Sequence, residues 1–145
     1  MRIVTGSDHA GFSLKQDLIS WLKEQGHEVT DKGTPVAERC DYPDYARPVA
    51  EAVVSGEADW GLLVCGTGIG MSMSANKVNG VRAAVVSDAF SARATRLHNN
   101  ANVLCLGERV VGAGLAREIL AAWLDATFEG GRHQGRIDKM MALES

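Results

Sequence analysis

Five short apolar runs recur along the chain, and longer stretches with helical spacing separate them. The runs cover residues 2–6, 27–31, 60–65, 81–86 and 102–107. Most of them are nearly continuous rather than alternating, which is typical of parallel strands that are covered on both faces. The pattern therefore predicts five strands of one parallel sheet.

Four of the intervening stretches carry apolar residues at the spacing of an amphipathic helix. The expected stripes are Leu14, Leu18, Trp21 and Leu22; Tyr45, Ala46, Val49, Ala50 and Val53; Phe90, Ala94 and Leu97; and Ala116, Ile119, Leu120 and Trp123. Gly26 and Gly56 are expected to end two of these helices, and Asp88 to cap the start of another. This strand–helix alternation predicts an open parallel α/β sheet with helices on both faces.

Length and composition fit one soluble globular domain, residues 1–145, because 46% of the residues are apolar and 23% are charged. The net charge of −3 gives no general attraction to nucleic acid or to an anionic membrane. No leader-like segment and no run of roughly 18 apolar residues is present. Three widely spaced cysteines indicate neither a disulfide framework nor a zinc site, so we expect a cytoplasmic protein with free thiols.

The tail at 130–145 lies beyond the last helix that is expected to cover the sheet. It begins with the polar stretch GGRHQGR and continues with several apolar residues. Since one domain offers little remaining surface, we expect this tail to pack on a second subunit. Arg132 and Arg136 lie one helical turn apart, which suits either a solvated face or a clamp for phosphate.

Polar residues that follow the strands are candidates for the functional site, because ligands of such sheets bind beyond the carboxyl ends of the strands. These segments are GSDHAG (6–11), CGTGIG (65–70), SDAF (87–90) and GER (107–109). A GTGIG loop presents backbone N–H groups to a phosphate or a developing oxyanion. It also resembles half of a dinucleotide fingerprint, with Asp88 downstream. Met71 at the third glycine position, and a location after the third strand, argue against that alternative.

Cys65 stands where the third strand meets this glycine loop. A cysteine is often a small core residue, and we interpret Cys105 and Cys40 as structural. The start of a helix and adjacent N–H groups favour the thiolate of Cys65, which would make it a base or nucleophile. Asp8 and His9 suit a turn as well as a site, and His98 suits a helix C-terminus as well as catalysis. No metal is expected, since no ligand spacing such as HxxxH is present.

Taken together, GSDHAGF, DYPDYA, CGTGIGMSMSANK, RLHNNANVLCLGERV and EGGRHQGRI resemble the B-type ribose-5-phosphate isomerases. That family also includes the galactose-6-phosphate isomerase subunits and the allose-6-phosphate isomerases. The resemblance runs from residue 2 to about residue 143. It implies a Rossmann-like three-layer α/β/α sandwich that acts as a homodimer, or as a tetramer of two dimers. It also implies that neither a metal nor an organic cofactor is needed.

The resemblance also implies roles for single residues. Cys65 would move the proton between C1 and C2, Thr67 would assist transfer to the substrate oxygens, and His98 would open the furanose ring. Asp8 would contact sugar hydroxyls, Tyr42 would line the pocket, and Asn99 would stabilise the enediolate with the N–H groups of the loop at Gly66, Gly68 and Gly70. The phosphate would be bound by His9, Arg109, Arg132 and Arg136, the last two from the partner subunit.

The sequence therefore predicts an aldose–ketose isomerase that interconverts ribose 5-phosphate and ribulose 5-phosphate without a cofactor. A second possibility keeps this mechanism with another sugar: allose 6-phosphate, galactose 6-phosphate or a tetrose phosphate. Pentose phosphate metabolism and the catabolism of rare sugars both use such chemistry. A third possibility is a module that binds a nucleotide or a sugar phosphate without catalysis.

Overall fold

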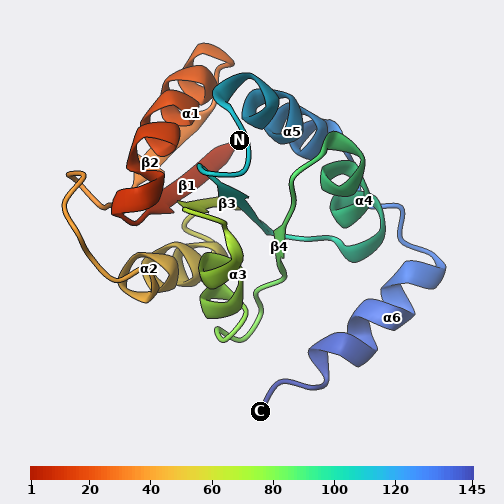
Figure 1. The fold of residues 1–145 in the computed structure, drawn as a ribbon. Coiled ribbons are helices and arrows are strands. Elements are labelled where there is room, and N and C mark those ends of the chain that lie inside the picture. Colours follow the sequence, from red (N-terminus) through yellow and green to blue (C-terminus); the bar gives the residue numbers. More distant parts are fainter.

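The computed structural model describes residues 1–145 and contains a sheet of five parallel strands (Figure 1). The strands are β1 (Arg2–Ser7), β2 (Glu28–Asp31), β3 (Trp60–Cys65), β4 (Ala83–Val85) and β5 (Val103–Gly107). Their spatial order is β2-β1-β3-β5-β4, so β3 lies at the centre and β4 at one edge. All five predicted strands are confirmed, although β4 is shorter than the apolar run at 81–86.

Six α-helices and one short 3₁₀ helix connect and cover the strands. They are η1 (His9–Gly11), α1 (Phe12–Glu24), α2 (Pro43–Val54), α3 (Ile69–Ala75), α4 (Ala89–Asn99), α5 (Ala113–Asp125) and α6 (Arg132–Met141). Figure 1 shows α1, α4 and α5 on one face of the sheet, and α2 and α3 on the other. The predicted three-layer α/β/α sandwich is therefore confirmed.

Each face of the sheet has its own apolar core, and β3 contributes alternate residues to both. Leu62 and Val64 belong to the core beneath α1, α4 and α5, whereas Leu63 and Cys65 belong to the core beneath α2 and α3. This division follows from the two-residue period of a strand, whose successive side chains point to opposite faces. The Cys65 side chain accordingly lies on the α2/α3 face, at the carboxyl end of the central strand.

The predicted helix boundaries are confirmed at three positions. Gly26 and Gly56 follow α1 and α2 with φ angles of 89° and 85°, the left-handed conformation that glycine adopts without strain. Asp88 accepts a hydrogen bond from the backbone N–H of Ser91 at 2.6 Å and caps α4.

The apolar stripe predicted for α4 is wrong. Phe90 is 79% exposed, and the residues that α4 buries are Ala92 and Arg96. The Arg96 guanidinium lies over the Trp60 ring at 3.8 Å from its centroid, with Trp123 at 5.4 Å. A planar cation stacks well on an aromatic face, so Arg96 can be buried in the core. The apolar pattern alone had instead predicted that Phe90, Ala94 and Leu97 face the core.

The Arg96→Ala substitution should lower the free energy of unfolding by about 3 kcal/mol, since it removes the stacking and a buried hydrogen bond. Arg96 Nη1 donates to the carbonyl oxygen of Ala101 at 2.6 Å, and this acceptor would be left without its partner. Urea denaturation of both proteins measures the loss. Arg93→Ala is the matched control, because Arg93 is exposed on the same helix and should cost less than about 0.5 kcal/mol. Equal losses in the two variants would contradict the role of the stack.

The C-terminal helix α6 stands at one end of the molecule, beside α4 (Figure 1). It buries His133 and Ile137, while its other residues remain exposed or half-buried. The chain end is attached through Glu144, whose carboxylate accepts a hydrogen bond from the backbone N–H of Gly80 at 2.8 Å. No helix in the structure has the length and apolar character needed to cross a membrane.

Candidate active site

An open pocket of about 450 Å³ lies at the carboxyl ends of the central strands. Eight of the residues predicted from the sequence line it: Asp8, His9, Tyr42, Cys65, Gly66, Thr67, Gly70 and Arg109. Ala10, Ile69 and Met73 complete the lining. Three strand ends supply the pocket, namely those of β1, β3 and β5, which are neighbours in the sheet. The topology therefore brings together segments that are separated by about a hundred residues in the sequence.

Cys65 is the last residue of β3 and is 5% exposed, so only a small part of its side chain reaches the pocket. Its Sγ accepts a hydrogen bond from the backbone N–H of Gly68 at 3.1 Å. Gly68 has a φ angle of 80°, and a Cβ at this position would lie 2.9 Å from the Leu106 backbone. A glycine is needed here so that the chain can turn back and present its N–H to the sulfur. The loop thus supplies a donor to the thiol, and such a donor binds a thiolate more strongly.

Thr67 lies two residues after the thiol on the same loop. Its Oγ1 accepts a hydrogen bond from the backbone N–H of Ile69 at 3.2 Å, which leaves the hydroxyl proton free to point elsewhere. Two N–H groups of the loop, those of Gly68 and Ile69, are therefore engaged by the Cys65 and Thr67 side chains. They orient the thiol and the hydroxyl at the start of α3.

The loop after β5 is bonded to the loop after β3, which positions Arg109. The Glu108 N–H donates to the Cys65 carbonyl oxygen at 2.9 Å, and the Arg109 N–H donates to the Gly66 carbonyl oxygen at 3.0 Å. A Cβ at Gly66 would lie 3.2 Å from Arg109 Nη1, so the guanidinium passes directly over this glycine. A cation is thereby held beside the thiol-bearing loop.

Gly107→Ala should lower kcat/KM at least about tenfold, because a shift of the catalytic groups by a fraction of an ångström is already costly. A Cβ at Gly107 would lie 2.6–2.7 Å from three backbone atoms of Thr67, so the 65–70 loop would have to move. Steady-state turnover measures the effect. Gly112→Ala is the matched control, since nothing lies within 4 Å of a Cβ there. A normal Gly107→Ala enzyme would show that the position of this loop is not critical.

Asp8 and His9 are each placed by one hydrogen bond, the first local and the second to a distant segment. Asp8 Oδ1 accepts from the Gly11 N–H at 3.1 Å, so the turn considered from the sequence exists and also lines the pocket. His9 Nδ1 accepts from the Cys40 backbone N–H at 3.2 Å, so a neutral His9 ring carries its proton on Nε2. Cys40, in a loop without a motif, thus orients His9 through its backbone. Only the fold reveals this contact.

Tyr42 is packed against the start of α3. A Cβ at Gly70 would lie 2.6 Å from a carbon of the Tyr42 ring, so the ring rests on this glycine. Tyr42 precedes α2, and Gly70 is the second residue of α3. The predicted position of Tyr42 as a wall of the pocket agrees with this contact.

Five predicted site residues are absent from the pocket lining. Gly68 belongs to the 65–70 loop and donates to Cys65 Sγ, whereas His98, Asn99, Arg132 and Arg136 lie elsewhere. His98 and Asn99 are the last residues of α4, which connects the parallel strands β4 and β5 and therefore runs back towards their amino ends. A helix of 11 residues spans about 16 Å. Arg132 and Arg136 are exposed on α6, beside this far end of α4. One chain thus carries its predicted site residues as two separate groups.

Around His98 the structure shows neighbours that the sequence reasoning missed. The His98 and His133 rings are stacked, with 4.5 Å between their centroids. Glu129 Oε1 lies 3.7 Å from His98 Nε2, and Glu129 Oε2 lies 3.5 Å from His133 Nε2. Burial, followed by the positive charge of Arg132, lowers the pKa of His133 below its ordinary value. His133 is thus buried beside His98 and Glu129, although Arg132 and Arg136 on the same helix are exposed.

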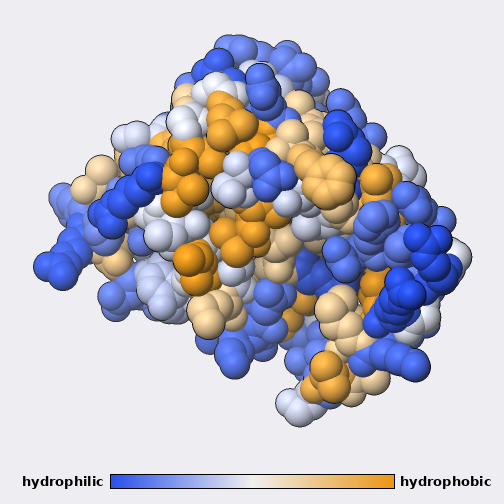
Figure 2. Space-filling model, turned by 45° about the vertical axis from the view of Figure 1, so that its right-hand side comes forward, coloured by the Kyte–Doolittle hydropathy of each residue, from blue (hydrophilic) through white to orange (hydrophobic).

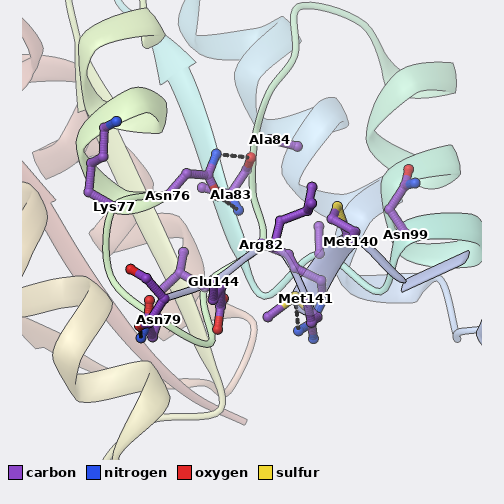
Figure 3. Close-up of a pocket in the computed structure, with 14 residues that line it drawn as sticks. Asn76, Lys77, Asn79, Arg82, Ala83, Ala84, Asn99, Met140, Met141 and Glu144 are labelled. Atoms are coloured by element: carbon purple, nitrogen blue, oxygen red, sulfur yellow. Dashed lines mark hydrogen bonds between the residues drawn. The ribbon is translucent and has the colours of Figure 1, made fainter. Parts of the chain in front are cut away.

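A larger cavity of about 560 Å³ lies between the chain end and the β4 edge (Figure 3). Of the predicted site residues only Asn99 lines it, together with Arg82, Glu144 and the last two residues of α6, Met140 and Met141. Figure 3 shows Asn99 on the opposite side of this space from Asn76. With no thiol or histidine in its lining, this cavity lacks the groups for the predicted proton transfer.

The three cysteines are unpaired, and their surroundings differ. Cys105 is fully buried in β5, and burial raises the pKa of its thiol far above the ordinary value. Cys105 is therefore a core residue, as expected from the sequence. Cys65 alone combines a place in the pocket with an N–H donor to its sulfur.

Comparison with known proteins agrees with this geometry. A model of the ribose/galactose isomerase family matches residues 3–140. Ribose-5-phosphate isomerase B of Escherichia coli is 53% identical over 143 residues, which cover 99% of this chain and 96% of the relative. A D-erythrulose-4-phosphate isomerase of Pectobacterium atrosepticum is 46% identical, with coverage of 97% and 93%. The structure of ribose-5-phosphate isomerase B from Clostridium thermocellum superposes with a TM-score of 0.98 at 52% identity and covers 99% of this chain and 97% of its own. The chain belongs to the ribose/galactose isomerase family.

Proposed function

We propose that this enzyme interconverts ribose 5-phosphate and ribulose 5-phosphate through an enediolate, with Cys65 as the base. The observation that carries the proposal is the Cys65 thiol, which lies at the pocket wall and accepts the Gly68 N–H at 3.1 Å. Two of the relatives, at 53% and 52% identity, carry the name ribose-5-phosphate isomerase B. An aldose and its ketose differ by the position of two hydrogens, so a base and an oxygen-binding site suffice.

In the proposed reaction the Cys65 thiolate removes the proton from C2 of the open-chain aldose and returns it to C1. Thr67 moves the proton between the two substrate oxygens, and the N–H groups of Gly66 and Gly70 stabilise the enediolate. Asp8 holds sugar hydroxyls, while His9 Nε2 and Arg109 bind the phosphate. The reaction is redox-neutral and needs no metal or organic cofactor, since the electrons stay on the substrate. The free thiols support a cytoplasmic location.

We further propose that a second copy of the chain completes the site. His98, Asn99, Arg132 and Arg136 lie about a helix length from the pocket of their own chain, at the α6 end of the molecule. Large apolar side chains are exposed at or just beyond the ends of β3, β4 and β5: Ile69, Met73, Val85, Phe90 and Val110. Figure 2 shows a broad apolar area on this side of the molecule, separate from the C-terminal helix. A partner subunit that covers this area would bring its α6 towards the Cys65 pocket.

Purified protein should turn over ribose 5-phosphate faster than allose 6-phosphate, galactose 6-phosphate or erythrose 4-phosphate, with a chelator present and no nucleotide added. The reason is that fixed cations would hold the phosphate, so the number of carbons in the sugar sets the distance from the phosphate to C1 and C2. That distance decides whether C1 and C2 lie next to the Cys65 thiol. A coupled assay over this panel measures the preference. Preference for another sugar would overturn the proposed substrate but leave the proposed roles of the site residues unchanged. If no sugar of the panel were turned over and a dinucleotide protected the protein, a binding module without catalysis would be favoured.

A tetrose phosphate is the second candidate, because the relative from Pectobacterium atrosepticum, at 46% identity, is named a D-erythrulose-4-phosphate isomerase. The same thiol and loop serve either sugar, since the proton moves between the same two carbons. Only the distance between the phosphate and the reacting carbons differs, and this distance depends on the two subunits together in the proposed dimer. The sugar panel separates the two candidates directly.

A further inference from the structure

Three side chains with metal-binding atoms meet where α4 and α6 touch. The Nε2 atoms of His98 and His133 lie 3.7 and 3.5 Å from the two oxygens of the Glu129 carboxylate. The ligand atoms of the three residues all lie within 4.8 Å of one another. Both imidazoles thus direct the same nitrogen towards one carboxylate, an arrangement that goes beyond a simple ion pair.

The backbone holds this cluster together from both sides. The Glu129 N–H donates to the Leu97 carbonyl oxygen at 3.1 Å, which ties the start of the tail to the residue before His98. His133 follows Glu129 by four residues, and its N–H donates to the Gly130 carbonyl oxygen at 3.1 Å. These two bonds place Glu129 beside the stacked imidazoles, so that its carboxylate faces the Nε2 atoms of both rings.

His133 gives a second, independent indication of a ligand. Its side chain is buried, with 6% of the residue exposed, and its Nε2 has no hydrogen-bond partner. A buried polar nitrogen without a partner is costly, and native structures rarely leave one in this state. This nitrogen faces the Glu129 carboxylate, where a bound cation would satisfy both groups.

The donor set indicates the class of ion. Two imidazole nitrogens and one carboxylate oxygen form a three-ligand set of the kind that binds Zn²⁺ and leaves a fourth position open. Mg²⁺ and Ca²⁺ prefer six or more oxygen ligands, which this cluster does not offer. Zinc bonds of about 2.0–2.1 Å require the ligand atoms to draw closer. His98 and Glu129 have the room to turn, since their side chains are 44% and 47% exposed.

We propose that His98, Glu129 and His133 form a site for Zn²⁺ or a similar divalent transition ion, and that the bound ion inhibits the enzyme. Binding of the ion depends only on the three side chains and the backbone that holds them. The inhibition rests on the proposed function, in which His98 takes part in opening the sugar ring. An ion on Nε2 removes the lone pair that this step uses, and it adds a charge beside Arg132 and Arg136. Zinc would then act as a switch on the isomerase.

Calorimetric titration of the chelator-treated, full-length protein with Zn²⁺ tests the site without any assay of activity. Wild-type protein should bind one ion per chain, and Glu129→Gln and His133→Gln should each weaken binding at least about tenfold. Glu129→Gln preserves shape and is the variant least prone to disturb folding. His27→Gln is the matched control, because His27 lies before β2 at the opposite edge of the sheet and should leave binding unchanged. Cobalt-substituted protein should show a spectrum without a thiolate charge-transfer band.

Absence of binding, binding that survives both substitutions, or a thiolate band from a cysteine would each overturn the zinc site. Turnover assays then test the inhibition: zinc should inhibit wild type reversibly, and Glu129→Gln should keep its turnover in the presence of zinc. Inhibition that persists in Glu129→Gln would refute the switch. A protein that binds zinc at this cluster but turns over no sugar phosphate would refute the proposed function and leave the zinc site standing, so the two failures are distinct.

Discussion

Replacement of Cys65 by serine should reduce kcat about 10³-fold, since general acid–base groups typically contribute 10²- to 10⁴-fold. Oγ replaces Sγ at nearly the same place, but a serine hydroxyl ionises far less readily than a thiol. The Gly68 N–H can still donate to the new oxygen, so the loop should keep its conformation. Substrate binding should change little, because the proposed phosphate contacts come from other residues. The loss should therefore fall on kcat rather than on KM.

Steady-state kinetics and thermal unfolding together measure this effect. Cys40→Ser is the matched control: Cys40 is half-buried, and serine retains the backbone N–H that donates to His9 Nδ1. The Cys40 sulfur lies 4.0 Å from the same nitrogen, so its replacement by a hydroxyl removes only a weak contact. This variant should remain fully active, with an unfolding temperature close to that of wild type. If Cys65→Ser kept most of its turnover while Cys40→Ser behaved normally, the thiol would not be the base, and another group in the pocket would have to move the proton.

The location of Cys65 explains why a thiol stands where valine would pack equally well. Cys65 is the last residue of the central strand, so its side chain packs in the core with Leu63 and also forms part of the pocket wall. The following glycines bring an N–H to the sulfur and let Arg109 pass close by. In the proposed mechanism a base beside oxyanion donors needs both a buried strand end and a sharp turn, and this junction supplies both.

The sheet and its pocket could be predicted from the sequence because both depend on local signals. Continuous apolar runs indicated the buried strands, and the carboxyl ends of parallel strands must meet at one edge of a sheet. Seven of the eight predicted residues that line the pocket belong to segments that follow strands, whereas Tyr42 was implied only by the family resemblance. Gly26, Gly56 and Asp88 are likewise local signals, since a left-handed residue or a capping side chain acts on its own helix end.

Other features could not be predicted because they depend on contacts between distant segments. Arg96 occupies a core position on α4 only because Trp60 and Trp123 stack on it from a strand and another helix. The role of Cys40 arises from a backbone contact with His9, 31 residues away. His98 and His133 meet because Glu129 is bonded to the end of α4, and no spacing along the chain indicates this pairing.

Mixing two inactive variants should restore activity if each site takes residues from two chains. One variant is Cys65→Ser, and the other is the double substitution Arg132→Ala with Arg136→Ala. The double substitution should be nearly inactive, because each lost charge-assisted contact to phosphate costs about 1.5–3 kcal/mol. In a mixed dimer one site receives both lesions and the other receives none. Random pairing makes about half of the dimers mixed, so about a quarter of wild-type activity should return.

Unfolding the two variants together and refolding them allows the chains to exchange, and turnover per chain is then compared with that of each variant refolded alone. The matched control mixes Cys65→Ser with Thr67→Ala, two lesions on one loop of the same chain. Every dimer of that mixture carries a defect in each site, so no activity should return. Recovery in the first mixture and not in the second would mean that α6 completes the pocket of a partner. No recovery in either mixture, from protein that refolds as a dimer, would mean that each chain completes its own site, with α6 moved far from its position in the structure.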